Sequence, residues 1–306
     1  MNNTQRQEDT PRPRTEIESR HSNRLAGNRT VLIFIVISVN CRQNPTVSQP
    51  LMANPNSIAT STFSLDRPTV FTIHSYTETV SGNFNAHLVP AHLNSDDVNL
   101  IAVDWSRGST TYSVGLANSP QVGAVIATFI NILTNDFFYD VNLISIVGVG
   151  LGGHIAGVAG RRATGVIPRI VALDPSLIGW SHHPDKLSSN AARVVEVLHT
   201  TAGLYGYDRP MGHLDFYPNG GVQQSGCGTN IPCSHIFSYI FYAESINAEL
   251  NDGNKFVGTE CESYTQAIAN ECEGHRGTIF GGTEDKTGTN GIFTFNTNFQ
   301  PPFAQG

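Results

Sequence analysis

Short apolar runs recur along the chain from about residue 66 onward, and each has the length of a buried strand. Continuous apolar runs between polar turns are typical of strands inside a parallel sheet, where both faces are covered. The runs that we predict to be strands are Pro68–His74, Asn99–Trp105, Leu143–Val147, Ile170–Leu173 and Val194–His199.

Two segments between these runs have a helical pattern. Ala117–Thr134 carries apolar residues at helical spacing, and Ser119-Pro120 predicts its start because proline is favoured in a first turn. A second helix is predicted from His154 to Arg162. Strands that alternate with helices predict an α/β fold, with a mostly parallel central sheet and helices on both faces. Ligands of such sheets gather at the carboxyl ends of the strands.

The N-terminal part of the chain has a different character. Residues 1–29 are polar, and we predict that they form a disordered tail. Residues 30–41 form an apolar segment, which is either the core of a secretory signal or a buried first strand. Residues 42–306 then form the α/β domain, and no linker divides them after residue 66.

Composition narrows the class of protein. The 306 residues carry a formal net charge of −7, whereas nucleic-acid-binding proteins typically carry a positively charged surface. No run approaches the roughly 20 apolar residues that span a bilayer. Among the five cysteines, Cys227/Cys233 and Cys261/Cys272 have the short paired spacing of local disulfide loops in an oxidising compartment. Free thiols in a cytosolic protein remain the alternative at this point.

The turn Gly148-Val149-Gly150-Leu151-Gly152-Gly153 lies between a predicted strand and a predicted helix. It fits the GxGxxG fingerprint of dinucleotide sites, with Asp174 about twenty residues further on as the ribose-binding acid. It also fits the frame of a GxSxG nucleophile elbow, with Gly150 in the serine position. A third interpretation is a glycine turn that only permits close packing of helix and strand.

Residues further along the chain favour the elbow. An elbow enzyme needs an acid and then a histidine after the nucleophile. Asp174 ends the next predicted strand, and His235 opens an apolar helix, Ile236–Ile246. Each residue alone is weak evidence, because an aspartate before proline is often a turn former and a histidine at a helix start is often structural.

Several specific stretches resemble the pancreatic-lipase family, in particular its short-lid phospholipase A1-like members and related yolk proteins. The resemblance runs from about Arg42 to the C-terminus, and the LDP, GHLDFYPNGG and CSH blocks occur in the family's order. The matching stretches are Arg42–Thr46, Arg67–His74, Ile101–Arg107, Gly148–Gly160, Pro168–Pro175, Val197–Thr200, Gly206–Gly221, Cys233–His235 and Phe295–Phe303. The resemblance implies an α/β-hydrolase fold, and we expect no C-terminal β-sandwich domain.

The resemblance also implies roles for single residues. Asp174 matches the triad acid and His235 the triad base, while the backbone N–H groups of Tyr76 and Leu151 match the oxyanion hole. Cys227–Cys233 resembles the disulfide at the base of the lid, and Cys261–Cys272 a second family disulfide. The chain departs from the family where the catalytic serine should stand, which is Gly150. Val149 replaces the family's histidine beside it, and Ser75 replaces a glycine before the oxyanion loop.

These departures decide the expected function. Without a hydroxyl at Gly150, we expect a secreted and catalytically inactive homologue that binds lipid or another hydrophobic small ligand, or serves as a yolk-type storage protein. Contact with a lipid surface is a further expectation. We expect no metal, no cofactor and no nucleic-acid partner. The alternatives are an active phospholipase A1 or triacylglycerol lipase with another nucleophile, and nucleotide binding through the glycine turn.

Overall fold

The computed structural model of the chain describes residues 36–42 and 44–306. The predicted tail, residues 1–29, and the first part of the apolar segment 30–41 lie outside the described residues. The described end of that segment is strand β1 (Val36–Cys41), which pairs antiparallel with β4 and with β2 (Asn44–Leu51).

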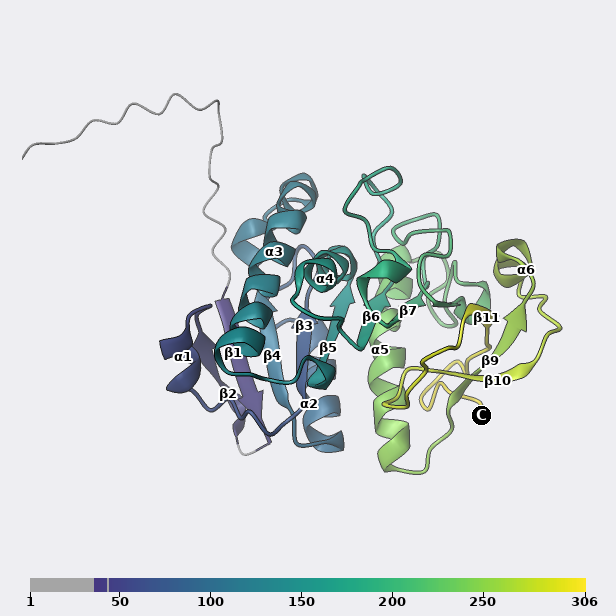
Figure 1. Ribbon diagram of the computed structural model, residues 1–306. Helices are drawn as coiled ribbons and strands as arrows, with labels where there is room; N and C mark the ends of the chain where they lie inside the picture. The colour runs from purple at the N-terminus through teal and green to yellow at the C-terminus, as the bar shows by residue number, and fades with distance from the viewer. Residues whose placement is uncertain (1–35, 43) are drawn as a thin grey trace, which may run out of the picture. The chain divides into compact units, whose positions relative to one another are not determined.

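A single sheet of eleven strands organises the described residues, in the order β10-β9-β11-β8-β7-β6-β5-β3-β4-β1-β2. Its central strands from β4 to β11 run parallel, and two antiparallel strands close each edge (Figure 1). The parallel strands are β3 (Thr69–Ile73), β4 (Asn99–Asp104), β5 (Ile144–Val149), β6 (Arg169–Leu173), β7 (Val194–Leu198), β8 (Leu214–Phe216) and β11 (Gly291–Thr294). All five predicted strands are confirmed.

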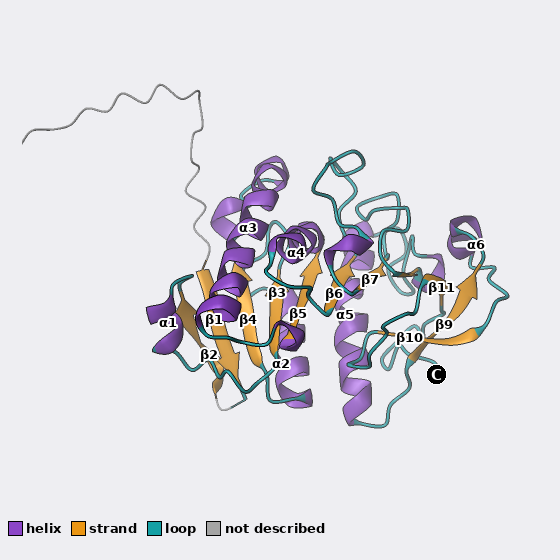
Figure 2. Cartoon of the chain, viewed as in Figure 1, coloured by secondary structure: helices purple, strands orange, loops and turns teal. Residues whose placement is uncertain are grey.

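Helices cover both faces of this sheet, as the alternating pattern predicts (Figure 2). Helices α3 (Tyr112–Asp136) and α4 (Leu151–Arg162) pack on one face, and α2 (Asn83–Ser95) and α5 (Ile231–Leu250) on the other. Two apolar cores result, one on each side of the sheet. Strand β3 contributes side chains to both cores, since Phe71 lies in the core under α3 and α4 and Val70 in the core under α2 and α5. Both faces of the sheet are therefore buried, which explains the continuous apolar runs in the sequence.

The remaining elements lie outside this central part. Helix α1 (Pro55–Ala59) follows β2, and α6 (Tyr264–Ala269) lies between β9 (Phe256–Cys261) and β10 (Arg276–Phe280). Short 3₁₀ turns at Ser106–Gly108, Val141–Leu143, Ser189–Ala191 and Pro218–Gly220 join the larger elements. The described residues contain this α/β domain and no separate β-sandwich.

The predicted start of the long helix at Ser119-Pro120 is wrong. Helix α3 begins at Tyr112, where the Thr111 side chain accepts a hydrogen bond from the Val114 backbone N–H. Pro120 therefore lies inside the helix, where it removes one backbone hydrogen bond. The neighbouring Ser119 hydroxyl donates to the Gly115 carbonyl oxygen at 2.8 Å, and the packed face of α3 outweighs the defect.

Helix α3 is also the one described helix that is long and apolar enough to cross a membrane, by length and composition. The count of uninterrupted apolar residues misses it because polar residues such as Asn118 and Gln121 interrupt the run. Its apolar stripe, including Val122, Ile126 and Phe129, is buried against the sheet and α4. The hydropathy of α3 is thus accounted for by its place in the core.

The second predicted helix begins earlier than expected. Helix α4 starts at Leu151 rather than His154, directly after the turn residue Gly150. The early start follows from the sharp strand-to-helix turn, in which β5 ends at Val149 and a single residue separates the two elements. This arrangement is that of a nucleophile elbow.

Candidate functional site

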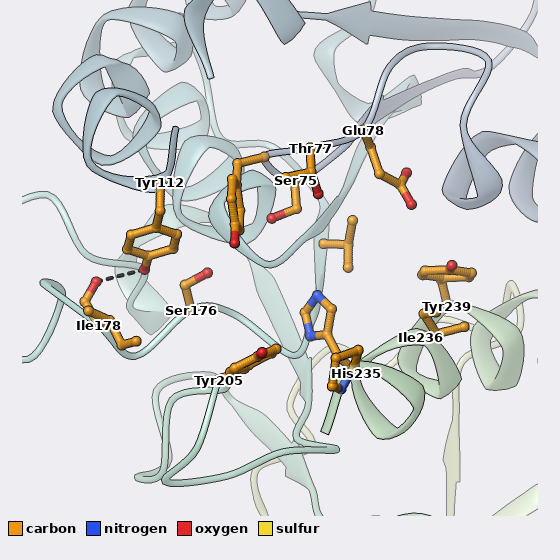
Figure 3. A pocket seen from close by; sticks show the side chains of 13 residues that line it. Ser75, Thr77, Glu78, Tyr112, Ser176, Ile178, Tyr205, His235, Ile236 and Tyr239 are labelled. Atoms are coloured by element: carbon orange, nitrogen blue, oxygen red, sulfur yellow. Dashed lines mark hydrogen bonds between the residues drawn. The ribbon is translucent and has the colours of Figure 1, made fainter. Parts of the chain in front are cut away.

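A pocket of about 500 Å³ opens at the carboxyl ends of the parallel strands, where the fold class predicts a ligand site. Its lining combines aromatic, apolar and a few polar side chains (Figure 3). The lining residues are Ser75, Tyr76, Thr77, Glu78, Tyr112, Val149, Ser176, Ile178, Tyr205, Pro232, His235, Ile236 and Tyr239. The His235 ring points into this space, with Tyr205 and Tyr239 to either side of it.

Gly150 lies at the tip of the turn between β5 and α4, beside this pocket. Its backbone has φ 57° and ψ −116°, a conformation that L-residues avoid and that glycine adopts at little cost. The flanking glycines serve packing, because a Cβ on Gly148 would overlap the Gly152 carbonyl oxygen and a Cβ on Gly152 the Ile73 carbonyl oxygen. The turn therefore has the backbone of an elbow and no side chain at its tip.

The acid and the histidine come together as predicted. The Nδ1 atom of His235 lies 2.6 Å from Oδ2 of Asp174, although the two residues are 61 positions apart. The Asp174 carboxylate is fully buried after β6, and the His235 side chain is 21% exposed at the pocket wall. A Cβ built on Gly150 would lie 3.5 Å from Cε1 of His235. The ring thus faces the space that a side chain at position 150 would occupy.

The Asp174 carboxylate is held by the backbone as well as by His235. Its Oδ1 atom accepts hydrogen bonds from the backbone N–H groups of Thr200 at 2.8 Å and Thr201 at 2.9 Å, and the Thr201 hydroxyl donates to Oδ2. Burial alone would raise the pKa of Asp174, but the hydrogen bonds and the charge of His235, with Thr201, hold it below its ordinary value. The carboxylate therefore stays ionised and oriented.

These contacts argue against the dinucleotide interpretation of the glycine turn. A ribose-binding acid needs a carboxylate that is open to the ligand's hydroxyl groups. Both oxygens of Asp174 are already occupied and fully buried. Asp174 is thus an internal partner of His235 and has no free oxygen to offer a nucleotide.

Helix α5 positions His235 in its second turn. Asn230 caps the helix by accepting a hydrogen bond from the Cys233 backbone N–H at 3.0 Å. The disulfide Cys227–Cys233 ties the start of this helix to the preceding loop. The second predicted disulfide, Cys261–Cys272, is also present, and it joins the end of β9 to the segment after α6. Both short cysteine spacings are confirmed as disulfides, and Cys41 is buried as a free thiol.

The expected oxyanion groups lie at the same end of the sheet. Leu151 begins α4, and its backbone N–H donates to the Ser75 hydroxyl oxygen at 3.3 Å. Tyr76 follows β3 and lines the pocket with its side chain 36% exposed. Ser75, which the sequence marks only as a replaced glycine, is thus in direct contact with the turn.

Several residues of the pocket, and one residue that holds Asp174, were not predicted from the sequence. Thr201 has no motif of its own, and only the fold shows that its hydroxyl reaches Asp174. Glu78, Tyr112 and Tyr205 lie in loops or at helix starts beyond the carboxyl ends of strands. That position, shared by all the loops at this edge of the sheet, is the signal that could have found them. Within residues 36–42 and 44–306, no group of three or more His, Cys, Asp or Glu is placed to hold a metal ion.

Comparisons with known proteins relate this chain to lipases. The model of the family described as Lipase matches residues 2–297. A pancreatic triacylglycerol lipase of Sus scrofa is 34% identical over 301 residues, which cover 86% of this chain and 65% of the relative. The inactive pancreatic lipase-related protein 1 of Mus musculus is 35% identical over 259 residues, covering 75% of this chain and 54% of that protein. The chain thus spans about half to two thirds of the length of these curated relatives.

Among solved structures, an α/β hydrolase from a Medee basin deep-sea metagenome library is similar with a TM-score of 0.36 and 13% identity. That match covers 60% of this chain and 70% of the hydrolase. The family match extends over nearly the whole chain. The chain therefore belongs to the lipase family, which includes the pancreatic triacylglycerol lipases.

Proposed function

We propose that this chain is a secreted, non-hydrolytic member of the lipase family that binds a lipid or another hydrophobic small ligand in its pocket. The observation that carries the proposal is the absence of a side chain at Gly150 beside a complete Asp174–His235 pair. Covalent ester hydrolysis needs an oxygen nucleophile at that point. Loss of the serine in a triad hydrolase costs on the order of 10⁶ in turnover.

Ligand binding does not depend on the missing hydroxyl. The pocket of about 500 Å³ has the size of small-molecule sites, and aromatic and aliphatic side chains line it. Tyr76, Ile178 and Tyr205 are partly exposed at this pocket, which suits contact with an acyl chain or a lipid surface. The two disulfides support an oxidising, extracellular location. Service as a yolk-type store of such a ligand is compatible with the same pocket.

Hydrolysis is tested with a fluorophosphonate probe and with p-nitrophenyl butyrate. We expect no labelled serine and no ester hydrolysis above the rate in buffer. Labelling of a defined serine, together with hydrolysis lost in His235→Ala, would show instead an active esterase with another nucleophile.

Binding is tested by the fluorescence of parinaric acid, a fatty acid that emits in apolar surroundings. The matched variants are Ile178→Asp and Val166→Asp, since both side chains are 58% exposed but only Ile178 lines the pocket. A carboxylate in an apolar lining opposes an acyl chain, so we expect Ile178→Asp to weaken binding by about tenfold. Val166→Asp should bind as the wild type does. Equal binding by both variants would place the ligand elsewhere.

A further inference from the structure

We propose that Ser75 seals the altered catalytic site, so that positions 75 and 150 form a crowded pair in which a side chain at one position disfavours a side chain at the other. The inference rests on the proposed absence of hydrolysis at Gly150 and explains what now occupies the nucleophile's place. It concerns two departures from the family pattern that lie 75 residues apart in the sequence and in contact in the fold.

The first observation is steric. A Cβ built on Gly150 would overlap the Ser75 hydroxyl oxygen and would lie only 3.0 Å from Cβ of Ser75. Rotation of the serine side chain can move the hydroxyl away, but Cβ of Ser75 is fixed by the backbone. Since carbon atoms in protein interiors pack at about 3.5–4.0 Å, the two side chains fit together only if the backbone at one of these positions shifts by a few tenths of an ångström. The side chain of Ser75 thus fills the space that a serine at position 150 would need.

The second observation concerns hydrogen bonding. The backbone N–H of Leu151 donates to the Ser75 hydroxyl oxygen at 3.3 Å, and Ser75 is 9% exposed. This N–H lies at the start of α4, where the first backbone donors of a helix have no partner within the helix. The family resemblance gives the same N–H to the oxyanion hole. A ligand carbonyl oxygen that approaches Leu151 would therefore meet a donor that Ser75 already occupies.

The geometry indicates that Ser75 fills the space beside Gly150 and does not act as a nucleophile. The imidazole of His235 faces the same space, at 3.5 Å from the Cβ that Gly150 lacks. No hydrogen bond between Ser75 and His235 occurs in the described residues, and the Ser75 hydroxyl oxygen accepts its hydrogen bond from the Leu151 amide. The hydroxyl oxygen is thus the acceptor of this hydrogen bond, and within the described residues its own O–H makes no hydrogen bond to a base that could remove the proton.

The test is a series of variants assayed with p-nitrophenyl butyrate and a fluorophosphonate probe. Gly150→Ser alone should stay close to the wild-type rate, because its new side chain meets Ser75. Adding Ser75→Gly should raise the rate of Gly150→Ser by about 10³-fold or more, since nucleophile and oxyanion donor are then both restored. Gly150→Ser with Ser75→Ala should fall between them, because Cβ at position 75 remains.

Controls separate this inference from the proposed function. His235→Ala in the double variant should abolish the gained activity, and Ser75→Gly alone should gain none. If Gly150→Ser alone equals the Gly150→Ser/Ser75→Gly double variant, Ser75 is no obstacle and the inference fails while the proposed function stands. If a folded double variant gains nothing, the inference fails as well. Labelling of the wild type at Ser75 would overturn both.

A milder pair covers the case in which Gly150→Ser does not fold. Ser75→Gly should raise the thermal midpoint of Gly150→Ala, because it removes the crowding between the two positions. The same change should leave the midpoint of the wild type unchanged or slightly lower. An equal shift in both backgrounds would show that positions 75 and 150 are independent and would overturn the inference.

Discussion

The two halves of the site differ in what the fold demands of them. Asp174 accepts hydrogen bonds from two backbone N–H groups and one hydroxyl in addition to its contact with His235, so it fixes the chain after β7. The tip of the turn at Gly150 makes no side-chain contact, and glycine there relieves a strained backbone. The fold therefore depends on the carboxylate of Asp174, whereas it gains nothing from a side chain at position 150.

An acid–histidine pair and the residue at the tip of the turn therefore carry different weight as evidence for catalysis. An intact acid–histidine pair is poor evidence for hydrolysis when the acid also satisfies buried backbone groups. The residue at the tip of the turn is the informative one, because a side chain there strains the backbone. In this chain that residue is glycine, while Asp174 and its buried partners are present.

The largest effect should come from Asp174→Ala. Removing the carboxylate leaves the buried N–H groups of Thr200 and Thr201 without an acceptor, and we expect a loss of about 3–5 kcal/mol in the free energy of unfolding. His235→Ala removes one partner at a partly exposed position and should cost about 1 kcal/mol. Urea denaturation of both variants measures the difference. Equal losses would show that Asp174 has no structural role beyond the pair.

A smaller effect is expected for Gly150→Ala. The positive φ costs about 1–3 kcal/mol for a residue with a Cβ, and the crowding against Ser75 adds to that cost. Gly228→Ala is the control for crowding, because Gly228 also has a positive φ, 54°, and no atom lies within 4 Å of the added Cβ. This control should show the cost of a positive φ without the cost of crowding. If both substitutions lower the free energy of unfolding equally, a Cβ at position 150 is not crowded by Ser75.

The smallest effect concerns how the free energy of unfolding falls at low pH. The folded-state pKa of Asp174 lies below its ordinary value of 3.8, so its ionised form stabilises the fold above that pH. This contribution is lost as the pH falls through the folded-state pKa, at about 1.4 kcal/mol for each unit of difference. Asp174→Asn cannot titrate, and its unfolding free energy should fall less steeply below pH 4 than that of the wild type. Parallel curves would remove Asp174 from the acid response.

Much of the fold could be predicted because both faces of the sheet are buried. Such strands are apolar throughout, and the pattern located β3 to β7. The later strands were missed for physical reasons. Strand β8 has only three residues and β11 four, too few to show a pattern, and β10 is partly exposed near the edge of the sheet. The start of α3 was misplaced because proline at a first turn and proline inside a packed helix look alike in the sequence.

In the site, too, some features could be predicted from the sequence and others could not. Asp174 and His235 were predicted because they stand in the family's order, and the structure brings them to 2.6 Å. The contact of Ser75 with the turn at Gly150 was not predicted, because the two residues follow neighbouring parallel strands whose register no local pattern reveals. Strands β3 and β5 pair with Ile73 beside Gly148, which places the residues that follow each strand against one another.

The close approach of Ser75 to Gly150 also bears on attempts to engineer this site. On the proposed crowding, a serine placed at position 150 meets its neighbour, while a glycine placed at position 75 supplies no nucleophile. We therefore expect a search through single substitutions to miss a gain of ester hydrolysis, and a library that varies positions 75 and 150 together to find it.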